Sequence, residues 1–156
     1  MKKITKLLVT GLLLIVLSFS LLSCQGKDKY KEYAGVYAVS EYLYYTYNNT
    51  TGAALVPKTA AELAATDEWI ELKADGTFLY HENEEDFIGG ETHVVNDSGT
   101  YTVSVNDGVT ELTLEQSHDG MVTVYKYTYS NNTLVYTVYA ELGVNGVQTK
   151  VTYTKK

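Results

Sequence analysis

Turn sequences recur at short intervals along the chain and divide most of it into short segments. Asp-Gly or Asn-Gly pairs, or similar turn residues, occur at 74–76, 97–99, 106–108, 118–120, 130–132 and 144–146. Such pairs supply the positive φ of tight hairpins, so successive strands are expected to be antiparallel neighbours. Between the turns apolar and polar residues alternate, as in 100–105 and 111–115, which gives each strand one buried face. The sequence therefore predicts an all-β protein.

The number and length of the predicted strands favour a closed barrel. The last three strands are eight to ten residues long, whereas a strand usually has about five or six residues. Long open edges promote aggregation, so we expect an up-and-down meander that closes into a barrel of eight or nine strands. A barrel of this size is either filled by side chains or holds one small ligand. The predicted strands are 34–47, 69–73, 77–82, 92–95, 99–105, 110–116, 121–130, 133–142 and 147–154.

One segment, Asn48 to Glu68, interrupts the strand pattern. Thr59 and Glu62 match a capping box, which predicts a short helix over Ala60–Ala65. Long connections in compact domains are often functional, and we expect this one to form a lid over the open mouth of the barrel. The apolar side chains available to face inward are Leu55, Val56 and Leu63.

The first 24 residues have the build of a secretory signal. A short head with three lysines precedes an apolar run over 7–22, and the run ends at Leu21-Leu22-Ser23-Cys24. These four residues resemble a bacterial lipobox, in which the cysteine thiol receives a diacylglycerol and the chain is cut just before it. An uncleaved membrane helix and an ordinary signal with a chance cysteine are the alternatives, although the run is shorter than the ~20 residues of a spanning helix.

The lipobox resemblance implies three parts of the chain and one location. Residues 1–23 are then a lipoprotein signal peptide, 24–32 a lipidated N-terminus with a polar tether, and 33–156 the barrel domain. The expected partner is a lipid bilayer, reached through acyl chains such as palmitate on Cys24, because two or three chains on one residue hold a protein firmly. The expected location is the bacterial cell envelope, with the domain outside the cytoplasm.

Charge and residue usage exclude several function classes. Three of the twelve lysines and none of the nineteen acidic residues precede Cys24, so the remainder has a net charge of −10, and arginine is absent. Such a chain is a poor match for nucleic acid, and no nucleic-acid partner is expected. No nucleophile–base pair and no glycine-rich phosphate loop is recognisable, so we expect neither an enzyme nor a cofactor.

One cluster of acidic residues and histidines contains potential metal ligands. His81, Glu82, Glu84, Glu85 and Asp86 surround one predicted hairpin, and Glu91 and His93 follow. Carboxylates can bind calcium and imidazoles can bind zinc. The spacing fits no calcium loop and no zinc-protease helix. A solvated acidic hairpin tip is the favoured interpretation, and no metal site is expected.

Tyrosine is the most unusual component, with fifteen tyrosines against three phenylalanines and one tryptophan. A tyrosine on a sheet can pack its ring while its hydroxyl stays hydrated or hydrogen-bonded. The same property suits a binding surface. Both interpretations, structural and functional, follow from the composition.

Several short motifs resemble the lipocalin-like domains of small bacterial lipoproteins. They are Gly35-Val36-Tyr37, the run 72–78 (Leu-Lys-Ala-Asp-Gly-Thr-Phe), the run 99–103 (Gly-Thr-Tyr-Thr-Val), Leu112-Thr113-Leu114 and the final Tyr-Thr-Lys at 153–155. The resemblance implies a lipocalin-like barrel that forms a cup for a small apolar ligand. The residues expected to line this cup are Tyr37, Tyr42, Tyr44, Leu63, Tyr101, Tyr125, Tyr127 and Tyr136.

Two function hypotheses remain. The first is a membrane-anchored, non-catalytic lipoprotein that binds a small apolar ligand inside the barrel. The alternative is a surface interaction or adhesion module that uses exposed, tyrosine-rich strands. A hollow interior lined by tyrosines would favour the first, and exposed aromatic side chains gathered in one patch would favour the second.

Overall fold

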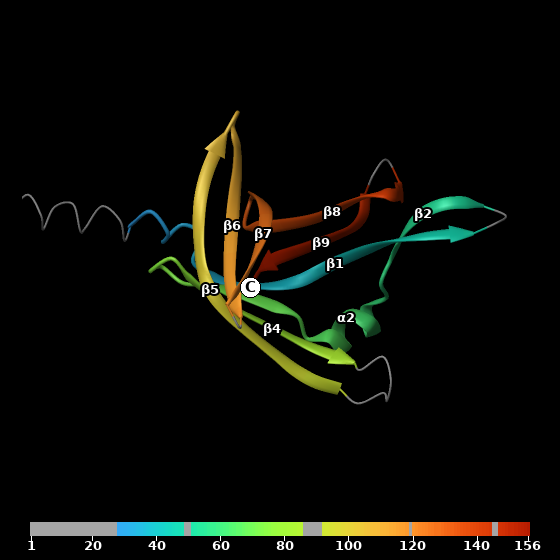
Figure 1. Cartoon of the computed structure of the whole chain (residues 1–156), viewed down its shortest axis with the longest axis horizontal. Coiled ribbons are helices and arrows are strands. Elements are labelled where there is room, and N and C mark those ends of the chain that lie inside the picture. The colour runs from blue at the N-terminus through green and yellow to red at the C-terminus, as the bar shows by residue number, and fades with distance from the viewer. Residues whose placement is uncertain (1–27, 49–50, 86–91, 119, 145–146) are drawn as a thin grey trace, which may run out of the picture.

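The computed structural model describes residues 28–48, 51–85, 92–118, 120–144 and 147–156. Within them the chain forms strands and one short helix, as Figure 1 shows. The strands are β1 (Gly35–Asn48), β2 (Gly52–Pro57), β3 (Trp69–Leu72), β4 (Thr77–Glu85), β5 (Thr92–Asn106), β6 (Val109–His118), β7 (Met121–Ser130), β8 (Thr133–Val144) and β9 (Val147–Lys155), and the helix is α2 (Ala60–Thr66). The predicted all-β class is confirmed.

Eight of the strands form a closed antiparallel barrel. The strand order β1-β3-β4-β5-β6-β7-β8-β9 closes because β1 also pairs with β9, from Tyr37 opposite Lys155 to Tyr44 opposite Thr149. The ninth strand, β2, pairs with the distal half of β1. The β1–β2 hairpin projects from the barrel in Figure 1. The predicted up-and-down barrel is therefore confirmed.

The described hairpin turns have the backbone geometry that their sequences predict. Asp107 and Gly108 both have positive φ, 52° and 80°, and they join β5 to β6. Asn131 and Asn132, with φ of 49° and 60°, join β7 to β8 in the same way. Two consecutive positive φ values match the right-handed twist of the flanking strands. These turns fix the order of neighbours around the barrel.

The predicted turn at 97–99 is wrong, because β5 runs unbroken through it. The two strands expected at 92–95 and 99–105 are one strand of 15 residues. A Cβ atom on Gly99 would collide with the carbonyl oxygen of Glu115 and lie 2.8 Å from the Phe78 ring. Gly99 thus permits a close approach between strands rather than a reversal of the chain. β5 curves strongly in Figure 1, as a barrel of this size requires.

A bulge in β1 changes which of its residues face inward. The register with β9 shifts between Val39 and Glu41, so the strict alternation of the strand is interrupted there. Tyr37 is fully buried, whereas Tyr42, five residues later, also lies on the inner side. Without the bulge, an odd spacing would place one of these two rings outside.

One end of the barrel is filled by a core of tyrosine and aliphatic side chains. Tyr30 packs edge-on against Tyr101 at 5.0 Å, and Tyr33 packs in the same way against Tyr129. The Tyr37 hydroxyl donates to the carbonyl of Tyr33 at 2.6 Å. The expected tether included Tyr30, but this residue belongs to the barrel's closed end; residues 24–27 lie outside the described part of the chain.

The segment between the first two barrel strands is more ordered than a loop. Residues 52–57, expected to lie in the loop, pair with β1 as strand β2. The predicted capping box is confirmed: Thr59 N–H donates to Glu62 at 2.7 Å, and Glu62 N–H donates to the Thr59 hydroxyl at 3.3 Å. The following helix α2 lies beside β1 and β4.

Neither α2 nor any other helix of the described residues has the length and hydropathy that membrane crossing requires.

Candidate functional site

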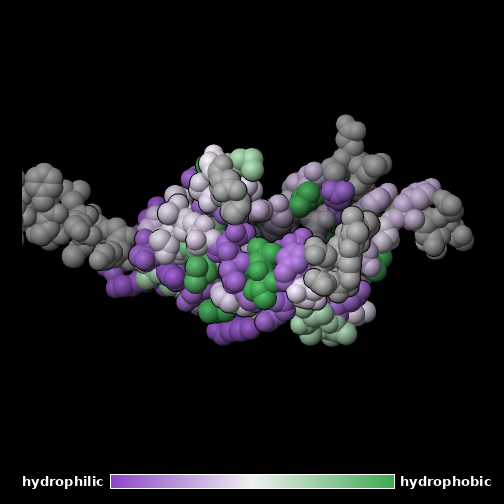
Figure 2. Space-filling model, turned by 60° about the horizontal axis from the view of Figure 1, so that its bottom comes forward, coloured by the Kyte–Doolittle hydropathy of each residue, from purple (hydrophilic) through white to green (hydrophobic). Residues whose placement is uncertain are grey.

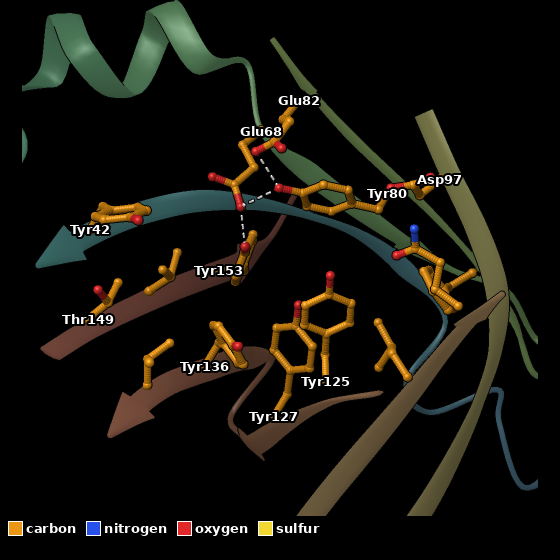
Figure 3. A pocket seen from close by; sticks show the side chains of 15 residues that line it. Tyr42, Glu68, Tyr80, Glu82, Asp97, Tyr125, Tyr127, Tyr136, Thr149 and Tyr153 are labelled. Atoms are coloured by element: carbon orange, nitrogen blue, oxygen red, sulfur yellow. Dashed lines mark hydrogen bonds between the residues drawn. The ribbon is translucent and has the colours of Figure 1, made fainter. Parts of the chain in front are cut away.

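A cavity of about 290 Å³ occupies the barrel interior beyond the filled end (Figure 3). Part of the apolar core forms its floor, including Phe78, Leu114 and Val151. Its volume is at the lower end of the ~300–1,000 Å³ typical of small-molecule sites. The barrel is therefore hollow at one end. The cavity is lined by Tyr42, Glu68, Phe78, Tyr80, Glu82, Asp97, Leu114, Gln116, Tyr125, Tyr127, Tyr136, Val138, Thr149, Val151 and Tyr153.

Four of the eight residues expected at the ligand site line this cavity: Tyr42, Tyr125, Tyr127 and Tyr136. The other four do not. Tyr37 and Tyr101 are buried in the closed end, where the Tyr101 hydroxyl donates to the carbonyl of Lys73 at 2.9 Å. Half-buried Tyr44 and Leu63 lie outside the cavity wall. The expected set did not distinguish the levels along the barrel axis at which these rings lie.

The tyrosines from β7, β8 and β9 form a continuous aromatic wall. The Tyr127 ring centroid lies 5.4 Å from that of Tyr136 and 5.9 Å from that of Tyr153. Tyr125 meets Tyr136 edge-on at 5.9 Å. Such tilted and edge-on pairs stabilise aromatic clusters beyond their buried area. Figure 3 shows Tyr125, Tyr127 and Tyr136 along one side of the cavity, with Glu68 across from them and the Tyr153 hydroxyl bonded to Glu68.

Glu68 is the buried charged residue of the site, and sequence analysis did not identify it. It lies between α2 and β3, and its backbone carbonyl accepts from Val39 N–H at 3.2 Å. Its side chain is only 8 % exposed. The hydroxyls of Tyr153 and Tyr80 both donate to its Oε1 atom, the latter at 3.2 Å. A glutamate directly before Trp69 reads as a surface residue in sequence, so no pattern signalled its burial.

Tyr80 links two carboxyl groups through one hydroxyl. This hydroxyl lies 2.5 Å from Oε2 of Glu82 as well as 3.2 Å from Oε1 of Glu68. A hydroxyl has one proton to donate. The two carboxyls therefore share this proton, which weakens each bond, unless one of them is protonated and donates to the Tyr80 oxygen. Here the sequence did contain a signal, because Tyr80 and Glu82 share a strand face with buried Phe78.

Burial is the dominant electrostatic effect at the site. It raises the pKa of Glu68; the charge of Glu82 acts in the same direction, while the hydrogen bonds from Tyr153 and Tyr80 and the charge of Lys58 oppose the change. Burial also raises the pKa of the Tyr80 and Tyr153 hydroxyls far beyond the physiological range, so both remain proton donors. The site therefore presents hydroxyl donors and a carboxyl that can accept or release a proton.

The acidic hairpin does not gather into a metal site within the described part of the chain. His81 stacks on Trp69, with ring centroids 4.9 Å apart, and its Nδ1 lies 2.8 Å from Asn96. His93 lies 3.9 Å from Glu84. The described residues contain no group of three or more potential metal ligands. Asp86 and Glu91, two members of the expected cluster, lie outside the described residues, as does Cys24.

Comparison with known proteins adds no family. No protein-family model, no curated protein and no solved structure matches the chain significantly.

Proposed function

We propose that this chain is a membrane-anchored, non-catalytic lipoprotein whose lipocalin-like barrel binds a small, largely apolar ligand. The single observation that supports this function most is the cavity of about 290 Å³ inside the barrel. Six tyrosines contribute to its wall, together with aliphatic side chains. Concave sites that combine aromatic and aliphatic side chains with convergent polar groups are typical of small-molecule binding.

The distribution of aromatic side chains favours this function over an adhesion surface. Among the described side chains, the strongly exposed aromatics are Tyr47 and Tyr139, at 65 % and 73 %. On the face shown in Figure 2, hydrophobic surface forms separate patches between hydrophilic regions. An adhesion module would instead present aromatic residues together in one patch. Most tyrosines of this barrel point inward or are partly buried.

Blocking the cavity tests ligand binding. Val138 lines the cavity, and Val138→Trp would fill part of it, whereas Val105→Trp places the same ring at a site that is 63 % exposed. The full-length protein in phosphatidylcholine nanodiscs is titrated with the neutral fluorophore N-phenyl-1-naphthylamine and with naphthalene, and empty nanodiscs give the background. We expect saturable binding to the wild type and to Val105→Trp but not to Val138→Trp. Absence of binding to the wild type, or equal binding to all three, contradicts the function.

Lipidation of Cys24 is tested separately. Cells that express the full chain are grown with an alkyne analogue of palmitate, and the purified chain is assayed for the label. We expect the label on the wild type and on Ser23→Ala, which retains the thiol, and no label on Cys24→Ser, because the thiolate is the nucleophile that accepts the lipid. An unlabelled wild type, or a labelled Cys24→Ser variant, refutes the anchor.

A further inference from the structure

The charge of the cavity wall is entirely negative. Glu68, Glu82 and Asp97 contribute carboxyl groups, and none of the fifteen lining residues is a lysine or a histidine. Among the described residues, no basic side chain forms an ion pair with these three carboxyls. They come from three different parts of the barrel, the α2–β3 connection, β4 and β5. The cavity thus combines tyrosine rings and aliphatic side chains with three acid groups that form no ion pair among the described residues.

The tyrosine rings of the aromatic wall also attract positive charge. The face of a tyrosine ring carries negative electrostatic potential and attracts ammonium groups. The chain itself provides an example at the edge of the cavity, where the ammonium of Lys58 lies 4.1 Å from the centroid of the Tyr42 ring. Tyr125, Tyr127 and Tyr136 lie along the wall opposite Glu68 in Figure 3. The tyrosine rings and the carboxyl groups therefore both favour a positively charged ligand.

The environment of Glu68 indicates where the positive charge of a ligand would lie. A buried carboxylate is costly without an opposite charge, and two tyrosine hydroxyls compensate only part of that cost. An anionic ligand would add repulsion from Glu68, Glu82 and Asp97. A neutral ligand would leave the Glu68 carboxylate without an opposite charge. A ligand with an ammonium group would supply the missing counter-ion and form a charge-assisted hydrogen bond.

We propose that the ligand is a small organic amine, with its ammonium group against Glu68 and its apolar body among the tyrosine rings. This ligand class rests on the function proposed above and specifies the charge of the molecule that the cavity takes. A volume of about 290 Å³ restricts the ligand to a small organic molecule. The net charge of −10 beyond residue 23 also steers cations toward the protein.

Three compounds of matched size separate charge from apolar contact. 2-Phenylethylamine is cationic, 2-phenylethanol is neutral, and 3-phenylpropanoate is anionic at pH 7.5. Each is titrated by calorimetry into the full-length protein in phosphatidylcholine nanodiscs, with empty nanodiscs as background. We expect the amine to bind at least about tenfold more tightly than the alcohol, which corresponds to one charge-assisted hydrogen bond. The anion is expected to bind most weakly.

Paired variants assign the effect to one carboxyl. Glu68→Gln is expected to weaken amine binding about tenfold and to change alcohol binding less than about threefold. Glu71→Gln removes the same charge from β3 at a position outside the cavity wall and is expected to change neither. Lys58→Gln removes a like charge near the site, so it is expected to strengthen amine binding about two- to threefold without affecting the alcohol. A gain in affinity cannot result from misfolding.

The outcomes distinguish this inference from the function on which it rests. If the alcohol binds as tightly as the amine, or Glu68→Gln weakens both equally, the amine assignment is wrong while ligand binding stands. Tightest binding of the anion also overturns it. If none of the three compounds binds and the neutral probes described above fail as well, the ligand-binding function itself is refuted.

Discussion

Replacing Glu68 by glutamine should make the protein more stable at neutral and alkaline pH. The substitution keeps the size of a side chain that is 8 % exposed and removes its charge. Both hydroxyls meet the same carboxyl oxygen, Oε1, so an amide oxygen at that position still accepts from Tyr153 and from Tyr80. The change therefore isolates the cost of placing a negative charge at this position.

The expected gain is the difference between two opposing contributions. Two hydrogen bonds change from charge-assisted to neutral, which loses about 1 kcal/mol each. Removing the desolvation cost of one buried ion gains several kcal/mol, about 3 at the low end. The repulsion from Glu82 also disappears. The free energy of unfolding should rise by about 1 kcal/mol or more, which is a rise of about 3–5 °C in Tm for a domain of this size.

The sign of the pH dependence provides a second check. Because burial raises the pKa of Glu68 above its ordinary value of 4.5, the folded protein binds more protons than the unfolded chain between 4.5 and the raised pKa. The stability that this group contributes is fully present below pH 4.5 and is lost as pH rises through its folded pKa. The advantage of Glu68→Gln over the wild type should therefore be small near pH 4 and grow toward pH 8.

Fluorescence of Trp69 reports the unfolding. It is the only tryptophan of the chain, and it adjoins Glu68 and stacks on His81. Thermal unfolding of the full-length protein in detergent micelles is followed at pH 4, 6 and 8, with Glu71→Gln as the charge-matched control. A lower Tm for Glu68→Gln at pH 8 would show that the carboxylate stabilises the fold. An advantage that is independent of pH would show that the charge is not its cause, and either result would refute the reasoning.

Three further predictions use the same unfolding assay. Gly99→Ala should lower the free energy of unfolding by about 3 kcal/mol or more, because its methyl group would meet the Glu115 carbonyl. Gly108→Ala should lower it by about 1 kcal/mol, because Gly108 has a φ of 80° but open space around it. The reverse ranking would contradict the role of Gly99 in the close approach of the strands. Tyr101→Phe should cost about 1 kcal/mol through the lost hydrogen bond to Lys73, and an unchanged Tm would show that this bond contributes nothing. Calcium and zinc should leave Tm unchanged, since a metal at a hundredfold excess over its Kd would add about 2.7 kcal/mol and a clear rise would reveal a site.

The elements that local chemistry determines could be predicted from sequence. Turn pairs such as 107–108 and 131–132 gave the antiparallel order, and Thr59 with Glu62 gave the start of the helix. Alternation over 100–105 placed Tyr101 on the buried face of its strand. Each of these features depends on residues only a few positions apart, so a single sequence contains the information.

The remaining features depend on contacts between distant strands. Gly99 looked like a turn glycine, and only the approach of β6 to β5 shows why a side chain is excluded there. The bulge near Ser40 follows from the register between β1 and β9, which are more than a hundred residues apart at that point. The burial of Glu68 likewise requires Tyr80 and Tyr153, which lie on two other strands. No short pattern encodes these three-dimensional contacts.

The two ends of the barrel differ in packing, and this difference bears on function. At the closed end, Tyr30, Tyr37 and Tyr101 fill the space and find hydrogen-bond partners or edge-on ring contacts. At the other end the chain leaves a cavity and buries the Glu68 carboxyl. Natural sequences depart from such packing rules mainly at functional sites, where stability is lost in exchange for binding or reactivity. If Glu68→Gln proves more stable and binds amines less well, the same side chain will account for both effects.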